Sequence, residues 1–305
     1  MRWSLSKRRY ARRLWGYASE PLERRVRTLR GRDQDYTIGG VSVVLPPDHK
    51  LPYYQRRDPT YDEYAGRIVG ELARDVDKLL MIDLGANVGD TAVLALASAD
   101  NVDVRCVEGS ARYAGYCRRN VARFGERATV IERFVGPVGK HRKFVETGTT
   151  AGFYGDVTEG GDAPDGTDWL TPTELLEGAD EYPRVLWKTD IDGFDIHILV
   201  EHWDVIRANC EVLWFEFDPP GTLGDRSDIA RLCELVGSSG LDMVVYDNLG
   251  RRMFSMPAGP AAGTSLLGLA RWLDDIRLGH LTVQYLDVWL MPTALAARVC
   301  ADGAA

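Results

Sequence analysis

The sequence predicts an α/β fold of the Rossmann-like kind, with a mostly parallel central sheet covered by helices on both faces. Two observations predict it. From residue 79 onward, short apolar runs alternate with segments of helical length or periodicity, a pattern typical of βαβ units. One junction between an apolar run and the next helix is rich in glycine, as it is where nucleotide cofactors bind in such sheets.

Seven apolar runs are the candidate strands of this sheet. Because both faces of a parallel sheet are covered, its strands are expected to be apolar almost throughout. A helix at about 266–278 is expected before the last of them. The runs are Leu79–Leu84, Asp103–Glu108, Thr129–Phe134, Val185–Asp190, Val212–Phe217, Met243–Asp247 and Gln284–Leu290.

The chain divides into two parts by composition. Residues 1–60 are expected to form a basic N-terminal arm, which has some amphipathic helical pattern, and the short strand Val41–Leu45. Residues 61–305 are expected to form the main domain. A helix at about 60–76 stands at the boundary, because Thr60 and Glu63 have the spacing of a capping box. Residues 156–168 are rich in Gly and acids and predict a surface loop.

The composition is that of a globular protein. Of the 305 residues, 45% are hydrophobic and 27% are charged, which is ordinary for a soluble domain. We expect neither a transmembrane segment nor a secretory signal, because no apolar stretch is long enough. The five cysteines are scattered and no pair has C-x-x-C spacing. This predicts neither a zinc site nor a disulfide framework, and favours a reduced, cytoplasmic setting.

The charge is unevenly distributed. Residues 1–32 hold eleven basic and two acidic side chains, a net charge of +9. Because the whole chain has a net charge of −8, the remaining residues carry −17. We expect the acidic body to disfavour nucleic acid as a partner, because it repels phosphates. The basic arm is expected either to be solvated or packed on the domain, or to contact an anionic surface or another subunit.

The segment DLGANVGD, from Asp83 to Asp90, carries the clearest local signal for a cofactor. A dinucleotide fingerprint that begins at Gly85 would need glycine at positions 87 and 90, where the chain has Asn87 and Asp90. An acid at the start of a helix opposes a pyrophosphate, which the positive end of the helix attracts. The loop therefore favours a cofactor that lacks phosphates and carries ammonium and sulfonium groups.

A second acid completes the predicted cofactor site. Glu108 ends the second strand, and its distance along the chain from Asp83 is close to the roughly 20 residues expected of a ribose-binding acid. We expect its carboxylate to accept hydrogen bonds from both ribose hydroxyls. The predicted cofactor-binding residues are Asp83, Gly85, Ala86, Asn87, Gly89, Asp90, Glu108, Gly109, Ser110, Phe134, Val135 and Asp190.

About half of the chain resembles the FkbM family of methyltransferases. The matching stretches are IDLGANVGDTAVLALA from Ile82, VEGS from Val107, DWLTPTELL from Asp168, LWKTDIDGFDIHIL from Leu186 and VLWFEFD from Val212. The family pattern K-x-D-x-E-G-x-E is present with Asp in place of both Glu. The resemblance implies a class I methyltransferase fold, S-adenosyl-L-methionine as cofactor and O-methylation of a sugar, glycan or other small metabolite.

Acids after the fourth and fifth strands are the candidates for catalysis. Asp190, Asp192 and Asp195 follow the fourth strand, and Glu216 and Asp218 end the fifth. Methyl transfer to an alcohol needs alignment and help from a base or a divalent metal. We expect Asp190 and Glu216 to form the centre of the acceptor site. They would act either as ligands of Mg²⁺ together with Asp218 or as base and orienting group, with Asp192 beside them. The alternative is a group of solvated acids that cap helices.

His197 is a further candidate for the base, because it lies beside the apolar stripe of the next helix. The alternative is that it is a boundary residue.

Three other functions compete with methyl transfer to a hydroxyl. An NAD-dependent oxidoreductase shares the fold class, but Asn87 and Asp90 disfavour it. A scaffold that has lost turnover remains open. The third is a nucleic-acid amino-methyltransferase, suggested by FDPPG at 217–221, which resembles the D-P-P-Y motif of that class but has Gly221 in place of its aromatic residue.

Overall fold

We describe the protein from a computed structural model. Predicted features that lie outside the described residues include Asp192, most of the basic arm and residues 157–168. Only the backbone is described at residues 57, 142–146, 152–156 and 275–276. The described residues are 25–26, 28–29, 31–57, 61, 63–135, 142–146, 152–156, 169–191, 193–276 and 283–301.

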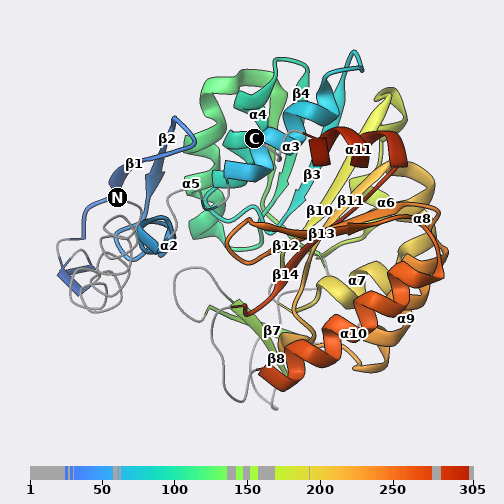
Figure 1. The fold of residues 1–305 in the computed structure, drawn as a ribbon. Helices are drawn as coiled ribbons and strands as arrows, with labels where there is room; N and C mark the ends of the chain where they lie inside the picture. The colour runs from blue at the N-terminus through green and yellow to red at the C-terminus, as the bar shows by residue number, and fades with distance from the viewer. Residues whose placement is uncertain are drawn as a thin grey trace, which may run out of the picture.

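An eight-stranded sheet forms the centre of the molecule (Figure 1). The strands from β5 to β11 run parallel, whereas β14 runs antiparallel to both of its neighbours and β13 runs antiparallel to β12. In order across the sheet, the strands are β13 (Arg252–Met256), β12 (Asp242–Asp247), β14 (Leu286–Met291), β11 (Val212–Phe217), β10 (Arg184–Thr189), β3 (Leu79–Leu84), β4 (Val102–Val107) and β5 (Ala128–Ile131).

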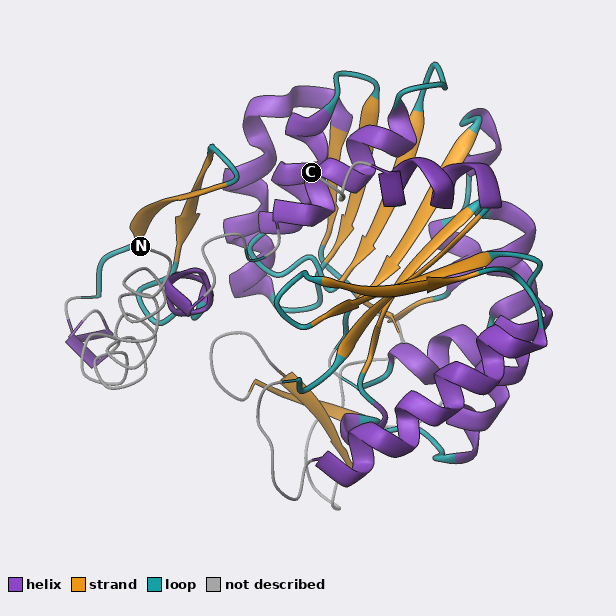
Figure 2. Ribbon diagram, viewed as in Figure 1, coloured by secondary structure: helices purple, strands orange, loops and turns teal. Residues whose placement is uncertain are grey.

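Helices cover both faces of the sheet (Figure 2). Alternate side chains of each strand point to opposite faces, so every central strand supplies residues to two hydrophobic cores. The first face carries α3 (Glu63–Ala73), α4 (Asp90–Ser98), α5 (Ala111–Val121) and α11 (Thr293–Ala301). The second carries α6 (Pro172–Leu175), α7 (Asp195–Glu201), α8 (Trp203–Asn209), α9 (Ser227–Ser238) and α10 (Pro260–Ile276).

Strand order and direction confirm the predicted fold class. All seven predicted strands lie in the sheet, and the last of them, β14, is inserted antiparallel between β11 and β12. This is the arrangement of the Rossmann-like class I methyltransferase fold. From β3 the chain first builds outward to β5 and then returns to β10 on the other side of β3. The carboxyl ends of β3 and β10 therefore border the switch point where ligands bind in open α/β sheets.

Shorter elements surround this core. The predicted strand at 129–134 ends at Ile131, because Phe134–Val135 (β6) pairs instead with Trp169–Leu170 (β9). The other elements are the β7–β8 hairpin (Arg142–Glu146 and Gly152–Asp156), the β1–β2 hairpin (Gln34–Ile38 and Val41–Leu45), α2 (Leu51–Arg57) and the 3₁₀ turns Ala122–Arg127, Ala179–Glu181 and Pro219–Gly221. No helix in the described part of the chain is both long and apolar enough to cross a membrane.

The buried side chain of Asn120 fastens the N-terminal hairpin to the domain. Its amide oxygen accepts a hydrogen bond from the Val44 backbone N–H (2.7 Å), and its Nδ2 donates to the carbonyls of Val44 (3.0 Å) and Val88 (2.8 Å). Asn120 is 1% exposed. Because Val88 lies between β3 and α4, one side chain joins the hairpin, α5 and the glycine-rich turn.

We expect Asn120→Ala to lower the free energy of unfolding by about 2–4 kcal/mol, because buried backbone groups would lose their partners. Urea denaturation would measure the loss. The matched control is Asn209→Ala: Asn209 is exposed and hydrogen-bonds within its own helix, so its effect should stay within about 0.5 kcal/mol. Equal effects of the two substitutions would contradict the role given to Asn120.

Candidate active site

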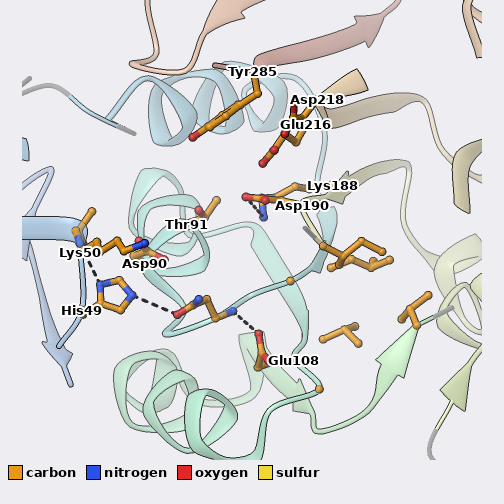
Figure 3. A pocket seen from close by; sticks show the side chains of 18 of the residues that line it. His49, Lys50, Asp90, Thr91, Glu108, Lys188, Asp190, Glu216, Asp218 and Tyr285 are labelled. Atoms are coloured by element: carbon orange, nitrogen blue, oxygen red, sulfur yellow. Dashed lines mark hydrogen bonds and ion pairs between the residues drawn. The ribbon is translucent and has the colours of Figure 1, made fainter. Parts of the chain in front are cut away.

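A cavity of about 360 Å³ opens at the carboxyl ends of β3, β4, β10 and β11. Its size lies in the range of small-molecule sites. Ten of the residues singled out from the sequence line it: Gly85, Asn87, Asp90, Glu108, Gly109, Phe134, Val135, Asp190, Glu216 and Asp218. Figure 3 shows Glu108 on one side of this space and Glu216, Asp218 and Tyr285 on the opposite side.

The glycine-rich turn after β3 lies against the end of β10. Gly85 has a φ of +75°, and a Cβ at this position would lie 1.8 Å from the carbonyl oxygen of Asp190. Asn87 and Gly89 also have positive φ angles, 48° and 79°. Because L residues with side chains avoid this region, the turn requires glycine at 85 and favours Asn at 87.

Glu108 is fixed over this turn by two backbone donors. Its Oε2 accepts from the Asn87 N–H (2.8 Å) and its Oε1 accepts from the Ser110 N–H (2.7 Å). A carboxylate oxygen can accept more than one hydrogen bond. Four residues predicted to bind cofactor are not among those that line the cavity: Asp83, Ala86, Gly89 and Ser110. They support the loop, as Ser110 does by capping α5.

Phe134 forms a wall of the cavity beside Glu108. A Cβ at Gly109 would lie 2.0 Å from the Phe134 ring, so the ring packs directly on the backbone after β4. On its other side the ring contacts Trp169, with centroids 5.7 Å apart. This part of the cavity therefore combines an acid with an apolar aromatic surface.

A buried ion pair lies beneath the cavity. Lys188 of β10 and Asp83 of β3 are register partners, with Nζ and Oδ1 2.8 Å apart and both side chains almost fully buried. Nζ is also 3.7 Å from an Asp190 oxygen and 5.5 Å from the centre of the Trp214 ring. Burial disfavours the ammonium, but the negative charges of Asp83 and Asp190 raise the pKa of Lys188 above its ordinary value. The lysine therefore stays charged.

Carboxylates gather on the far side of this ion pair. Asp190, Glu216 and Asp218 line the cavity, and Asp287 of β14 is the cross-strand partner of Glu216. Burial raises the pKa of Asp287 to about 7, even though Trp214 donates a hydrogen bond to it. Asp287 was not singled out from the sequence, because a lone acid within the strand LDVWLM gives no local sign of its neighbours.

Two catalytic expectations are not supported by the described residues. No three His, Cys, Asp or Glu side chains in the described part of the chain are grouped so that they could hold a metal ion, so the Mg²⁺ site expected at Asp190, Glu216 and Asp218 is not found. His197 does not line the cavity; its Nδ1 lies 2.8 Å from Asp228 and its Nε2 3.2 Å from Glu201.

Asp195, one of the acids that follow the fourth predicted strand, has a structural role. It accepts hydrogen bonds from Thr189 Oγ1 (2.9 Å) and from the backbone N–H groups of Ile191 (2.9 Å) and Gly193 (3.3 Å). Its carboxylate therefore closes the turn between β10 and α7.

The segment before α2 and the first turn of α2 supply cavity residues that sequence reasoning left unassigned. They are His49 and Lys50 before the helix and Leu51 and Tyr54 in it; other segments add Tyr61, Thr91, Arg133, Lys188, Ile191 and Tyr285. Three of them, Thr91, Lys188 and Ile191, lie in stretches that resemble the FkbM family; the others had no signal in the sequence.

His49 holds the glycine-rich turn through Asn87. Its Nδ1 accepts from the Leu51 N–H (3.2 Å), so its Nε2 carries the proton and donates to Asn87 Oδ1 (3.3 Å). The ring is 3% exposed, and burial lowers its pKa to about 4 despite the hydrogen bond to Asn87. The imidazole is therefore neutral at ordinary pH.

No protein-family model and no curated protein matches the chain. Among solved structures, it is similar to an O-methyltransferase from Bacillus cereus in complex with SAH (TM-score 0.41, 10% identity, 77% of this chain and 81% of that one). It is also similar to a precorrin-6y C5,15-methyltransferase from Geobacter metallireducens (TM-score 0.34, 15% identity, 75% and 87%). With such low scores, the fold assignment rests on the strand order.

We expect His49→Gln to flatten the pH dependence of stability between pH 6.5 and 4. The folded protein keeps His49 neutral down to about pH 4, whereas the unfolded chain binds a proton below about 6.5. Stability from this group is thus present above pH 6.5 and is lost as the pH falls towards 4. Over this interval the wild type should lose about 3 kcal/mol more than the variant, measured by urea denaturation. Parallel curves would show that His49 is not held neutral.

Proposed function

We propose that this protein is an S-adenosyl-L-methionine-dependent methyltransferase that methylates a hydroxyl of a sugar, glycan or other small metabolite. The observation that carries the proposal is the pairing of two acids at the cofactor loop. Glu108 is held over the turn by the Asn87 and Ser110 backbone. Asp90 stands at the start of α4, where a dinucleotide would place its phosphates.

Asp90 makes the helix start unsuitable for a diphosphate. Its carboxylate accepts hydrogen bonds from its own N–H and from that of Thr91, and burial raises its pKa. These two N–H groups belong to the positive end of α4, and in many nucleotide-binding proteins this end of a helix binds anions. Since an acid already occupies them, a phosphate there would lose its donors and meet a like charge. This argues against the NAD-dependent oxidoreductase.

The rest of the cavity fits the parts of S-adenosylmethionine. We propose that Glu108 binds the ribose hydroxyls, that Phe134 and Val135 face the adenine, and that Asp190 and Asp90 favour the cationic sulfonium and ammonium groups. When bound, the cofactor supplies an activated methyl group. The chain's own contribution is to hold donor and acceptor in line and to surround the positive charge with carboxylates.

We assign the acceptor to the side of the cavity lined by Glu216, Asp218 and Tyr285 (Figure 3). The Tyr285 and Tyr61 hydroxyls lie 3.5 Å apart, and Tyr54 stacks on Tyr61 with ring centres 5.2 Å apart. Carboxylates and phenols offer hydrogen bonds to a ligand with several hydroxyls. We propose that Asp190 and Glu216 act here as base and orienting group.

Gly221 argues against a nucleic-acid amino-methyltransferase. The Asp218 side chain folds back to accept from the Gly221 N–H (3.2 Å), and a Cβ at 221 would lie 2.1 Å from an Asp218 oxygen. The motif that resembles D-P-P-Y therefore lacks its aromatic residue and forms the turn after β11, capped by Asp218.

We keep the cytoplasmic setting as part of the proposal, supported by five cysteines that are all free thiols.

Calorimetric titration with S-adenosylhomocysteine and with NADH tests the cofactor. We expect wild type to bind S-adenosylhomocysteine and not NADH, and Glu108→Ala to weaken the binding by about 10-fold to 100-fold, because hydrogen bonds to a charged group are lost. Glu177→Ala changes an exposed acid that does not line the cavity; this control should bind as wild type. Tight binding of NADH alone would overturn the proposal.

Glu216→Gln tests the acceptor side. We expect methyl transfer from labelled S-adenosylmethionine to a panel of sugars and polyols to fall about 10²-fold to 10⁴-fold, as is usual when an acid–base group is lost. The affinity for S-adenosylhomocysteine should stay within about 2-fold of wild type, because Glu216 is assigned to the acceptor and not to the cofactor. Full turnover in the variant would remove Glu216 from the mechanism.

A further inference from the structure

We propose that Lys50 binds the carboxylate of the cofactor's amino-acid moiety, and that His49 holds Lys50 in place for this role. The inference rests on the proposed function, and nothing in the FkbM-like motifs assigns this residue. An amino-acid carboxylate in a cavity lined by Asp90, Glu108, Asp190, Glu216 and Asp218 needs a cation or free N–H donors, because it would otherwise meet only like charges.

The other sources of positive charge are engaged or lie elsewhere. The N–H groups of Asp90 and Thr91 at the start of α4 donate to the Asp90 side chain. Lys188 lies beneath the cavity, 3% exposed and 2.8 Å from Asp83. Arg133 lines the cavity immediately before Phe134, at the end assigned to the adenine. Among the described cavity residues, this leaves Lys50 as the cation on the side of the glycine-rich turn.

The side chain of Lys50 reaches into this part of the cavity. In Figure 3 it extends from the segment before α2 in the direction of Asp90 and Thr91. It is half-buried, and no ion pair or hydrogen bond joins its ammonium to a side chain in the described part of the protein. An ammonium held in a partly dry site without an acid partner is suited to a ligand carboxylate.

The backbone around Lys50 is fixed on both sides. On one side, His49 is bound to Asn87 of the glycine-rich turn and to the Leu51 N–H, and Asp48 makes an ion pair with Arg112 of α5 (2.7 Å). On the other side, the Lys50 carbonyl accepts from the N–H groups of Tyr53 (2.8 Å) and Tyr54 (3.1 Å) at the start of α2. Lys50 therefore keeps its place relative to the loop that holds the cofactor.

Two ligands separate a carboxylate contact from general cofactor binding. S-Adenosylhomocysteine carries the amino-acid carboxylate, whereas 5′-methylthioadenosine has the same nucleoside and lacks it. Measured by calorimetry, Lys50→Met should lower the affinity for S-adenosylhomocysteine about 10-fold or more, the usual effect of losing a charge-assisted hydrogen bond. Its affinity for 5′-methylthioadenosine should stay within about 2-fold of wild type. Lys50→Arg should retain most of the wild-type affinity for S-adenosylhomocysteine because it keeps the charge.

Lys78→Met is the matched control. Lys78 is an exposed lysine next to Asp103 and the Tyr182 ring, at the opposite end of β3 from the cavity, and both ligands should bind this variant as they bind wild type. An unchanged affinity of Lys50→Met for S-adenosylhomocysteine, or an equal loss for both ligands, would overturn the assignment of Lys50. If wild type binds neither ligand, the proposed function itself fails.

Discussion

The approach of Gly85 to the carbonyl of Asp190 is the constraint on which the site depends. It brings together the ends of two strands that are neighbours in the sheet but separated in the chain by two βα units. Because the contact leaves no room for a Cβ, the turn after β3 can lie directly beside Asp190. The same contact lies above the ion pair of Lys188 and Asp83, so the backbone and the buried charges fix the same two strands.

This arrangement gives the cavity an uneven distribution of charge. The cation of Lys188 is buried below the cavity and is neutralised there by Asp83 and Asp190, whereas Asp90, Glu108, Glu216 and Asp218 face the open space. A cationic ligand is favoured over an anionic one, since its charge meets carboxylates in a region of reduced dielectric. The acid at the start of α4 thus disfavours a phosphate there. It is also the reason why we propose a residue from another segment, Lys50, for the ligand carboxylate.

Sequence patterns predicted the central fold well because its signals are local. Each buried strand, such as Val212–Phe217, is a continuous apolar run, and Asp83–Asp90 joins strand to helix within a few residues. The strands β1 and β13 were missed because QDYTI and RMFSM are partly exposed edge strands with no apolar run. The face of a short helix was harder to judge, so His197 was considered for the cavity although it packs against Asp228 of α9.

Contacts between distant segments account for the rest of what sequence reasoning missed. His49 hydrogen-bonds to Asn87, 38 positions later in the chain, and Tyr61 to Tyr285, 224 positions later. No local sequence pattern predicts either contact. The hydrogen bonds of His49 and Asn120 join residues 34–57 to the glycine-rich turn, and part of this segment lines the cavity. Since both side chains hold the turn from Asn87 to Val88, a ligand that fixes this turn also favours the docked form of the segment. By linkage, a change that lowers the population of the docked segment lowers the affinity for such a ligand in proportion to that population.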